Sequence, residues 1–321
     1  MLITTNTFRT EAAGRSTNED NGCILNLKEN GLLMCVCDGM GGTAAGEIAS
    51  SIAVNAVKER FSQIPQNALQ EPTKYLEQSV VCADHAIKLY SEKHLETMGM
   101  GSTIVLAWIL NGEVFLAWCG DSRAYRYNSS LGLERLTHDH SLVQTWVDNG
   151  TITEKEAFNH PQSNIITRSL GNPESEAQPE NAIFSLYNGD IIMLCSDGLW
   201  GTLRDDEIEQ LLEKSDGEIG QIEETLWQNS KNVGWHDNVT TAITKIIRGG
   251  VDCIQVVEVH KKSYRKYWPY LAIAISAAVL LLLSFSIVSH KGKKAEKVEQ
   301  CVDKCKNIDQ VTDSIEKDTI K

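Results

Sequence analysis

The chain has 321 residues, of which 42% are hydrophobic, so it is long enough for one large domain or two modest ones with a buried core. This composition excludes an intrinsically disordered protein. Residues 1–248 carry 18 Lys and Arg against 34 Asp and Glu, a net charge of −16, whereas residues 249–321 carry 12 against 9. Because a nucleic acid backbone is bound through Lys and Arg, the acidic part argues against nucleic acid as the main partner. We expect a protein partner or a metal-bridged substrate instead.

The N-terminus and the cysteines both indicate a reducing compartment. The first 20 residues lack the basic and then apolar stretches of a cleaved signal peptide, so we expect the body of the chain to stay in the cytoplasm. Most of the cysteines lie in apolar runs without the spacing of a disulfide framework, as buried free thiols do. These are Cys23, Cys35, Cys37, Cys82, Cys119 and Cys195. Cys301 and Cys305 lie in a polar tail, and their role stays open.

Three apolar, strand-like runs each end in an aspartate beside a glycine. They span residues 31–42, 111–122 and 188–201, and the run 234–247 reverses the order by placing Asp237 just before a strand. Taken singly, an Asp-Gly pair after a strand is usually only a turn, because Asp bonds its own backbone and Gly tolerates a positive φ. Its recurrence makes the aspartates candidates for one shared site.

Helical periodicity separates these strand-like runs, at residues 46–61, about 73–94 and 205–214. Strands and helices are mixed without strict βαβ alternation. Several strand pairs are close enough to form hairpins, with Asn111-Gly112 and Asn188-Gly189 as turn signals. The sequence therefore predicts an α+β fold with largely antiparallel sheets and segregated helices.

Acidic residues mark the ends of the expected strands: Asp38, Asp121, Asp197 and Asp237, with Glu19-Asp20 before a further strand. Carboxylates that converge repel one another unless a cation neutralises them. Oxygen ligands without His or Cys at zinc spacing favour Mg²⁺ or Mn²⁺ over Zn²⁺. Two such ions bridged by one Asp would hold and acidify a water beside a phosphorus atom, so the expected chemistry is hydrolysis.

Arg15 lies four residues before Glu19. A guanidinium can grip two phosphate oxygens at once, a geometry that Lys does not reproduce. In isolation Arg15 would be interpreted as a solvated surface residue. Its place beside the acidic pair makes it a candidate phosphate ligand.

Eight collinear blocks of sequence, together spanning essentially all of residues 1–248, resemble the bacterial protein phosphatase 2C family of PPM-type serine/threonine phosphatases. The blocks are GRSTNED (14–20), VCDGMGG (36–42), GMGSTIVLAWI (99–109), WCGDSRAYRY (118–127), LTHDHSLVQTWVDNGTITEKEAFNHP (136–161), NIITRSLGN (164–172), GDIIMLCSDGLWG (189–201) and HDNVTTAI (236–243). The resemblance implies a four-layer α-β-β-α sandwich of two antiparallel sheets flanked by helices, with metal ions at one edge. It also implies hydrolysis of phosphoserine and phosphothreonine on proteins, which reverses serine/threonine kinase signalling.

The resemblance further implies two Mn²⁺ or Mg²⁺ ions per domain and a role for each matching residue. Asp38 would bridge the ions, and Gly39 would give its backbone carbonyl to one of them. Asp197 and Asp237 would complete the ligands of the other ion.

The remaining matches concern water, a third ion and the phosphate. Asp20, with Glu19 beside it, would act mainly through metal-bound waters. Asp121, together with Asp197, matches the weaker third metal site of the family. Arg15 matches its phosphate-gripping arginine.

One departure from the eukaryotic branch concerns the proton donor. A His often follows the first Asp-Gly there, whereas Met40 occupies that place in this chain and in the DGMGG form of bacterial members. Histidines can titrate near neutral pH, but each is more readily interpreted as a packed or solvated structural residue. The candidates are His138, His140, His160 and His236.

Residues 136–170 match the mobile flap that overhangs the site in bacterial members. The segment is rich in His, Asp, Asn and Thr, has weak periodicity, and lies between two strong strand signals. Loops of this length inside a compact domain are usually functional, so we expect it to select the phosphoprotein.

An uncharged apolar run at residues 271–288 is long enough to cross a bilayer as a helix. Trp268 and Tyr270 stand at one end as interfacial anchors, and basic residues flank both sides, so the positive-inside rule does not settle the orientation. A core helix of this length is rarely apolar on every face. We therefore expect a single-pass membrane protein with its catalytic domain in the cytoplasm.

These signals divide the chain into four parts. They are a catalytic domain at 1–248, a juxtamembrane linker at 249–267, a transmembrane helix at 268–289 and a polar, Lys-rich tail at 290–321.

Three other functions fit the sequence less well. A phosphatase-like binding module that has lost catalysis would normally have a broken metal set, whereas every position is present here. A dinuclear hydrolase of small phosphorylated molecules would share the metal core, but the collinear flap and strand blocks favour a protein phosphatase. A single-pass receptor that binds divalent ions would need a larger tail than residues 290–321.

Overall fold

The structure is a computed structural model that describes residues 2–41, 45–215 and 217–250. All of these residues belong to one compact unit of the chain. Their strands and helices are intermixed, and every recorded strand pair is antiparallel, which confirms the expected α+β class.

The strands form two sheets. Sheet 1 has the order β1 (Ile3–Glu11), β11 (Val239–Arg248), β10 (Ile191–Cys195), β7 (Arg123–Asn128) and β8 (Gly132–Arg135). Sheet 2 has the order β2 (Asp20–Asn26), β3 (Leu32–Met40), β5 (Ile104–Leu110), β6 (Glu113–Cys119) and β9 (Glu180–Ser185), and the short β4 (Gly101–Ser102) pairs with β3.

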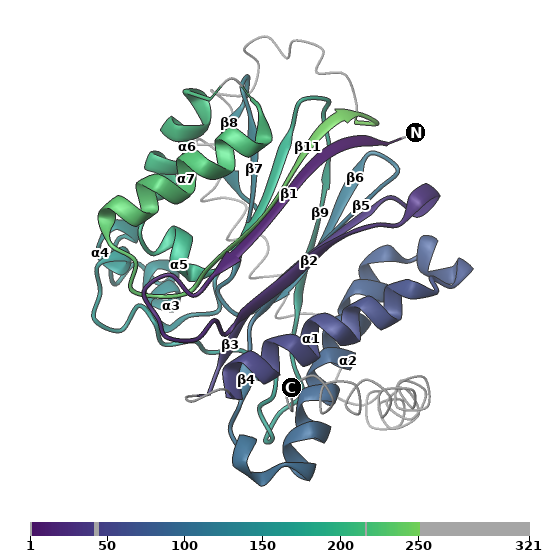
Figure 1. The fold of residues 1–321 in the computed structure, drawn as a ribbon, viewed down its shortest axis with the longest axis vertical. Helices are drawn as coiled ribbons and strands as arrows, with labels where there is room; N and C mark the ends of the chain where they lie inside the picture. Colours follow the sequence, from purple (N-terminus) through teal and green to yellow (C-terminus); the bar gives the residue numbers. More distant parts are fainter. Residues whose placement is uncertain (1, 42–44, 216, 251–321) are drawn as a thin grey trace, which may run out of the picture. The chain divides into compact units, whose positions relative to one another are not determined.

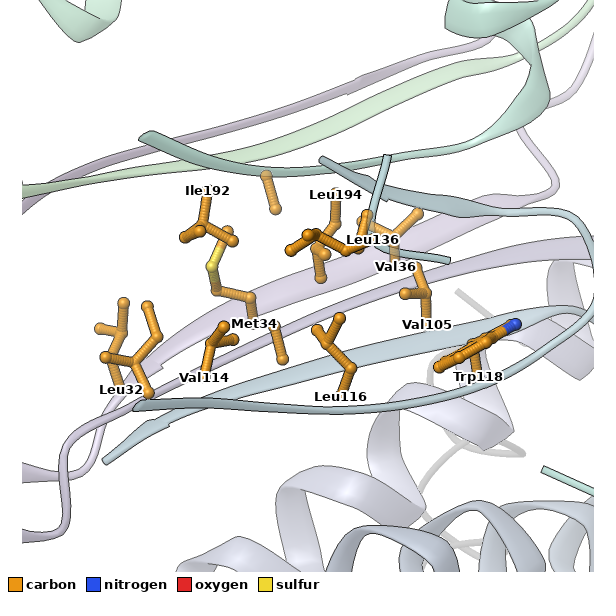
Figure 2. Close-up of a cluster of buried hydrophobic side chains, with 14 of the residues drawn as sticks. Leu32, Met34, Val36, Val105, Val114, Leu116, Trp118, Leu136, Ile192 and Leu194 are labelled. Atoms are coloured by element: carbon orange, nitrogen blue, oxygen red, sulfur yellow. The ribbon is translucent and has the colours of Figure 1, made fainter. Parts of the chain in front are cut away.

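A hydrophobic core lies between the two sheets, and Figure 2 shows side chains from both sheets pointing toward one another. Sheet 1 contributes Ala124, Ile192, Leu194, Ala242 and Ile246. Sheet 2 contributes Leu32, Met34, Val36, Val105, Ala107, Ile109, Val114, Leu116 and Trp118. Both faces of β5 are buried, which explains its unbroken apolar sequence IVLAWIL.

Helices cover the outer face of each sheet (Figure 1). The helices on sheet 2 are α1 (Ala45–Ser62) and α2 (Pro72–Lys93). Those on sheet 1 are α5 (Asp197–Trp200), α6 (Asp205–Glu213) and α7 (Ile219–Val233). Three short 3-10 helices are η1 (Lys28–Asn30), η2 (Gln66–Leu69) and η3 (Leu95–Thr97). The layer order is therefore α-β-β-α, as the resemblance implied.

The three helices expected from periodicity are present as α1, α2 and α6. Helix α7 was not expected. Its buried apolar residues are only Ile222, Leu226 and Trp227 in an otherwise polar stretch, and this signal is too sparse to stand out.

The two Asn-Gly turn signals have different outcomes. Asn111 and Gly112 both have positive φ (53° and 82°) and close the β5–β6 hairpin, as expected. Asn188-Gly189 instead joins β9 of sheet 2 to β10 of sheet 1, so the expectation of a hairpin there was wrong. An Asn-Gly pair favours a turn, but the sheet that the next strand joins is decided by burial of its side chains.

The flap at residues 136–170 contains two short helices, α3 (Leu142–Asp148) and α4 (Glu154–Phe158), rather than loop alone. Ser141 caps the first through its side chain, and Thr153 forms a capping box with Glu156 on the second. Helices of seven and five residues are too short to show a clear period, which explains the weak signal.

The linker at 249–267 beyond Gly250, the transmembrane helix at 268–289 and the tail at 290–321 all lie outside the described residues. Within the ranges that the structure describes, no helix is both long and apolar enough to cross a membrane.

Shortening a side chain in the core between the sheets should destabilise the fold. We expect Leu116→Ala to lower the free energy of unfolding by about 2–5 kcal/mol, because it removes buried methyl groups and leaves a cavity. Urea unfolding followed by tryptophan fluorescence measures this. Leu131→Ala, at a side chain that is 55% exposed, is the matched control. Equal effects of the two substitutions would contradict the described core.

Candidate active site

Five aspartates lie at one end of the sandwich. Asp20 begins β2 and stands directly opposite Asp38 near the end of β3. Asp121 follows β6 by two residues, Asp197 follows β10 by two residues, and Asp237 precedes β11 by two residues. Because β10 and β11 are antiparallel neighbours, the C-terminal end of β10 and the N-terminal end of β11 lie side by side at the same end of sheet 1. We call these five residues the carboxylate cluster.

The charges of the five side chains act within the cluster, which places these aspartates within electrostatic range of one another. Burial raises the pKa of Asp38 well above its ordinary value, and the charges of the other four aspartates raise it further. Burial, followed by the charge of Asp197, likewise raises the pKa of Asp121. The pKa of Asp20 rises to about 7, chiefly by burial and then by the charges of Asp197 and Asp237. The pKa of Asp197 rises to about 6, through burial and the charge of Asp237.

The cluster suits a cation by its chemistry. Asp20 Oδ1 and Asp197 Oδ1 are buried without a hydrogen-bond partner. Buried polar atoms are normally paired, and an unpaired carboxylate oxygen among like charges favours a bound cation. Among the described residues, however, no three His, Cys, Asp or Glu side chains already form a ligating group. The fit therefore rests on the unpaired oxygens and on the all-oxygen donor set, which matches Mg²⁺ or Mn²⁺.

Arg15 lies at the edge of this cluster. Its Nε donates to the backbone carbonyl of His236 at 2.9 Å, and its Nη2 donates to Asp237 Oδ2 at 2.7 Å. The Arg15 side chain is 54% exposed, and its charge opposes the rise in the pKa of Asp197. The structure thus places Arg15, the expected phosphate ligand, in contact with Asp237, an expected metal ligand.

Gly39 lies where β3 approaches the start of α1 most closely. A Cβ added at Gly39 would stand 2.0 Å from the carbonyl oxygen of Gly46 and 2.6 Å from that of Glu19. The Gly39 N–H donates to the same Glu19 carbonyl at 3.1 Å. Any side chain at Gly39 would push β3, α1 and Glu19 apart, so this position requires glycine.

Two hydroxyl residues that hold the aspartates were not singled out from the sequence. Ser196 Oγ donates to Asp20 Oδ2 at 2.6 Å and so ties sheet 1 to sheet 2 at the site. Thr103 Oγ1 accepts from the Asp38 N–H at 3.0 Å. The sequence does contain a signal for both residues. Ser196 stands directly before Asp197, and Thr103 follows a glycine-rich stretch, each beside an apolar run.

Three of the four candidate histidines have side-chain partners outside the carboxylate cluster, and the fourth, His236, is exposed. Buried His140 accepts a hydrogen bond from the Gly120 N–H through Nδ1, and its pKa is lowered, first by burial and then by Arg168. His138 pairs with Asp148. The ring of His160 packs edge-on against Trp146, and His236 meets Arg15 through its backbone carbonyl. None of these four side chains hydrogen-bonds to the carboxylate cluster in the recorded contacts.

Comparison with known proteins decides the family. A sequence profile described as Protein phosphatase 2C matches residues 11–241. The chain belongs to this family. It is 33% identical over 240 residues to the serine/threonine phosphatase stp of Listeria monocytogenes serotype 4b, which covers 74% of this chain and 94% of that protein. This protein phosphatase 2C chain is therefore an enzyme, a protein serine/threonine phosphatase, and members of its family are metal-dependent.

Solved structures agree with the fold. The crystal structure of the serine/threonine phosphatase Stp1 from Staphylococcus aureus has a TM-score of 0.69 and 37% identity, covering 77% of this chain and 95% of that one. The catalytic domain of PstP, a phosphatase of Mycobacterium tuberculosis, was solved in complex with two manganese ions. It has a TM-score of 0.67 and 30% identity, covering 77% of this chain and 100% of that one.

The raised pKa values make the stability of the metal-free chain depend on pH. An aspartate with an ordinary pKa of 3.8 that titrates near 7 when folded binds more protons in the folded state, so stability falls as pH rises through that interval. In chelator, we expect the melting temperature to be lower at pH 8 than at pH 5, and Mn²⁺ to restore it at pH 8. Differential scanning fluorimetry measures both effects.

Asp20→Asn should reduce this pH-dependent fall, since the amide has no proton to lose. Glu59→Gln, on the exposed face of α1, serves as the control and should keep the wild-type fall. The same fall in Asp20→Asn as in the wild type would contradict the described burial of Asp20.

Proposed function

We propose that the chain hydrolyses phosphoserine and phosphothreonine on proteins with the help of two Mn²⁺ or Mg²⁺ ions, and that it reverses serine/threonine kinase signalling at a membrane. The observation that supports the metal-dependent step is the convergence of five aspartates with two unpaired buried oxygens. Membership of the protein phosphatase 2C family supports the class of substrate.

The proposed ligands follow the arrangement of the cluster. Asp38 would be the ligand shared by the two ions, because it stands opposite Asp20 on the neighbouring strand and the charges of the other four aspartates all act on it. Gly39 would offer its backbone carbonyl to one ion, and Asp197 and Asp237 would hold the other. When bound, the ions supply the positive charge and the activated water that phosphate ester hydrolysis requires.

The other members of the site have supporting roles. Asp20 orients water, and its carboxylate is held in place by Ser196. Asp121, whose pKa is raised by the charge of Asp197, is the proposed side chain for a third ion together with Asp197. Arg15 binds the phosphate of the substrate through its half-exposed guanidinium.

The flap is the proposed surface for the protein part of the substrate. Its last residue, Leu170, exchanges backbone hydrogen bonds with Ser102, whose Oγ donates to the Asp38 carbonyl. The flap is thereby joined to the strand that carries the bridging aspartate. A phosphoprotein that contacts the flap would lie next to the carboxylate cluster.

The membrane role is proposed from sequence. It is supported by the uncharged run at 271–288, and the basic residues around it suit the ends of a transmembrane helix. The catalytic domain is assigned to the cytoplasm, where kinases that use ATP produce phosphoproteins.

The enzymatic proposal predicts metal-dependent turnover. Purified protein should hydrolyse p-nitrophenyl phosphate and a phosphothreonine peptide with Mn²⁺, and EDTA should abolish both activities. Asp38→Ala and Asp197→Ala should lower turnover by several orders of magnitude, because each removes a proposed ligand. Asp190→Asn is the matched control, since Asp190 is fully buried at the opposite end of β10. Wild-type rates in either alanine variant would refute the ligand assignment.

The membrane proposal is tested by fractionation. The full chain should pellet with membranes and resist carbonate extraction, because an apolar helix partitions into the bilayer core. A chain ending at Arg248 should stay in the supernatant. Release of the full chain by carbonate would show that residues 268–289 do not span the bilayer.

A further inference from the structure

Asn238 connects the two segments that meet at the edge of the site. The residue is 4% exposed and lies between Asp237 and β11. Its Oδ1 accepts from the Glu19 N–H at 2.8 Å, and its Nδ2 donates to the carbonyls of Ala12 and Thr17 at 2.9 and 2.8 Å. One amide group thus fastens residues 12–19, which we call the Arg15 loop, to the start of β11.

Apart from this amide, the Arg15 loop is held mainly by hydrogen bonds of Arg15 to His236 and Asp237 and by the Glu19 carbonyl, which accepts from Gly39. Its residues 14–17 are exposed, so little apolar packing holds them. Ala13 adopts a positive φ of 50°, a strained conformation for a residue with a side chain, which persists only where its surroundings impose it. The carbonyl of Ala12, directly before it, is one of the two that Asn238 binds. The Asn238 amide supplies three of the hydrogen bonds that hold this conformation, more than any other single side chain outside the loop.

The backbone of Asn238 acts on the cluster itself. Its N–H donates to Asp237 Oδ1 at 2.8 Å, which leaves the other oxygen of Asp237 for Arg15. Its carbonyl lies against Gly198, where an added Cβ would stand 1.9 Å away, so Asn238 also contacts the residue after Asp197. These two contacts use backbone atoms, which a side-chain substitution keeps, so the amide side chain acts on the Arg15 loop alone.

We propose that Asn238 is a positioning residue that fixes Arg15 relative to the carboxylate cluster and thereby sets the affinity of the enzyme for the phosphate group. The proposal rests on the phosphate-binding role assigned to Arg15 above. Asn238 does not touch the phosphate. It acts through the two carbonyls and the one N–H that it holds in the Arg15 loop.

The fastening is tested on the full chain by hydrogen–deuterium exchange, which does not depend on activity. In Asn238→Ala, amides of residues 12–19 should exchange at least about tenfold faster, because the loop loses three hydrogen bonds. The matched control is Asn128→Ala. Asn128 is equally buried, binds Asp190 at 2.6 Å, and lies at the opposite end of sheet 1. This control should leave exchange in residues 12–19 unchanged.

The effect on phosphate is tested by kinetics with p-nitrophenyl phosphate and Mn²⁺. In Asn238→Ala, KM and the inhibition constant of inorganic phosphate should each rise about tenfold, while kcat falls less, because an interaction that holds the bound phosphate is weakened. Combined with Arg15→Ala, Asn238→Ala should add little further change, since both act through one guanidinium. Asn238→Ser, whose hydroxyl cannot span both carbonyls, replaces the alanine variant if that variant does not fold.

The two ways of failing are distinguishable. Unchanged exchange of residues 12–19 in Asn238→Ala overturns the fastening itself. A normal phosphate affinity in Arg15→Ala overturns the assigned role of Arg15, and the proposal with it. Fully additive effects of the two substitutions on KM show that Asn238 does not act through Arg15, and this also overturns the proposal.

Discussion

Mutual repulsion among five clustered aspartates, of which Asp20 and Asp121 are buried, is the constraint on which the site of this protein depends. Burial and neighbouring negative charge both disfavour ionisation, so the cluster raises the pKa of Asp20 to about 7 and of Asp197 to about 6. Such an arrangement lowers the stability of the folded chain unless a cation is bound. In a metal-dependent family, a lower stability of the metal-free fold is the expected cost of keeping these carboxylates together.

The rest of the sandwich holds that cluster in place. The two sheets supply different aspartates, and the apolar core between them fixes the distance between Asp20 and Asp38 on one side and Asp197 and Asp237 on the other. Two side chains add hydrogen bonds that hold the site residues in place. Ser196 reaches from sheet 1 to Asp20, and Asn238 reaches from the start of β11 to the loop that carries Arg15. The apolar core thus holds together aspartates that would otherwise move apart through charge repulsion.

The sequence by itself determined the fold class and the identity of the candidate ligands. Repeated apolar runs ending in Asp beside Gly are local patterns, and they place Asp38, Asp121 and Asp197 correctly at strand ends. The periods of α1, α2 and α6 are likewise local, because a helix of nine or more residues shows its apolar face within its own sequence. The resemblance to the protein phosphatase 2C family added the layer order. The apolar run at 271–288 is a local signal of the same kind.

Only the tertiary structure decided which segments meet. Asn188-Gly189 looks like Asn111-Gly112 in the sequence. The first pair nevertheless connects strands of different sheets, whereas the second closes a hairpin, because burial of the following strand determines its partner. The same applies to Ser196 and Asn238, whose partners lie 176 to 226 residues away along the chain. The attachment of Arg15 to Asp237 is equally non-local. Hydrogen bonds over such separations leave no periodic pattern in the sequence, so they emerge only when the two sheets pack together.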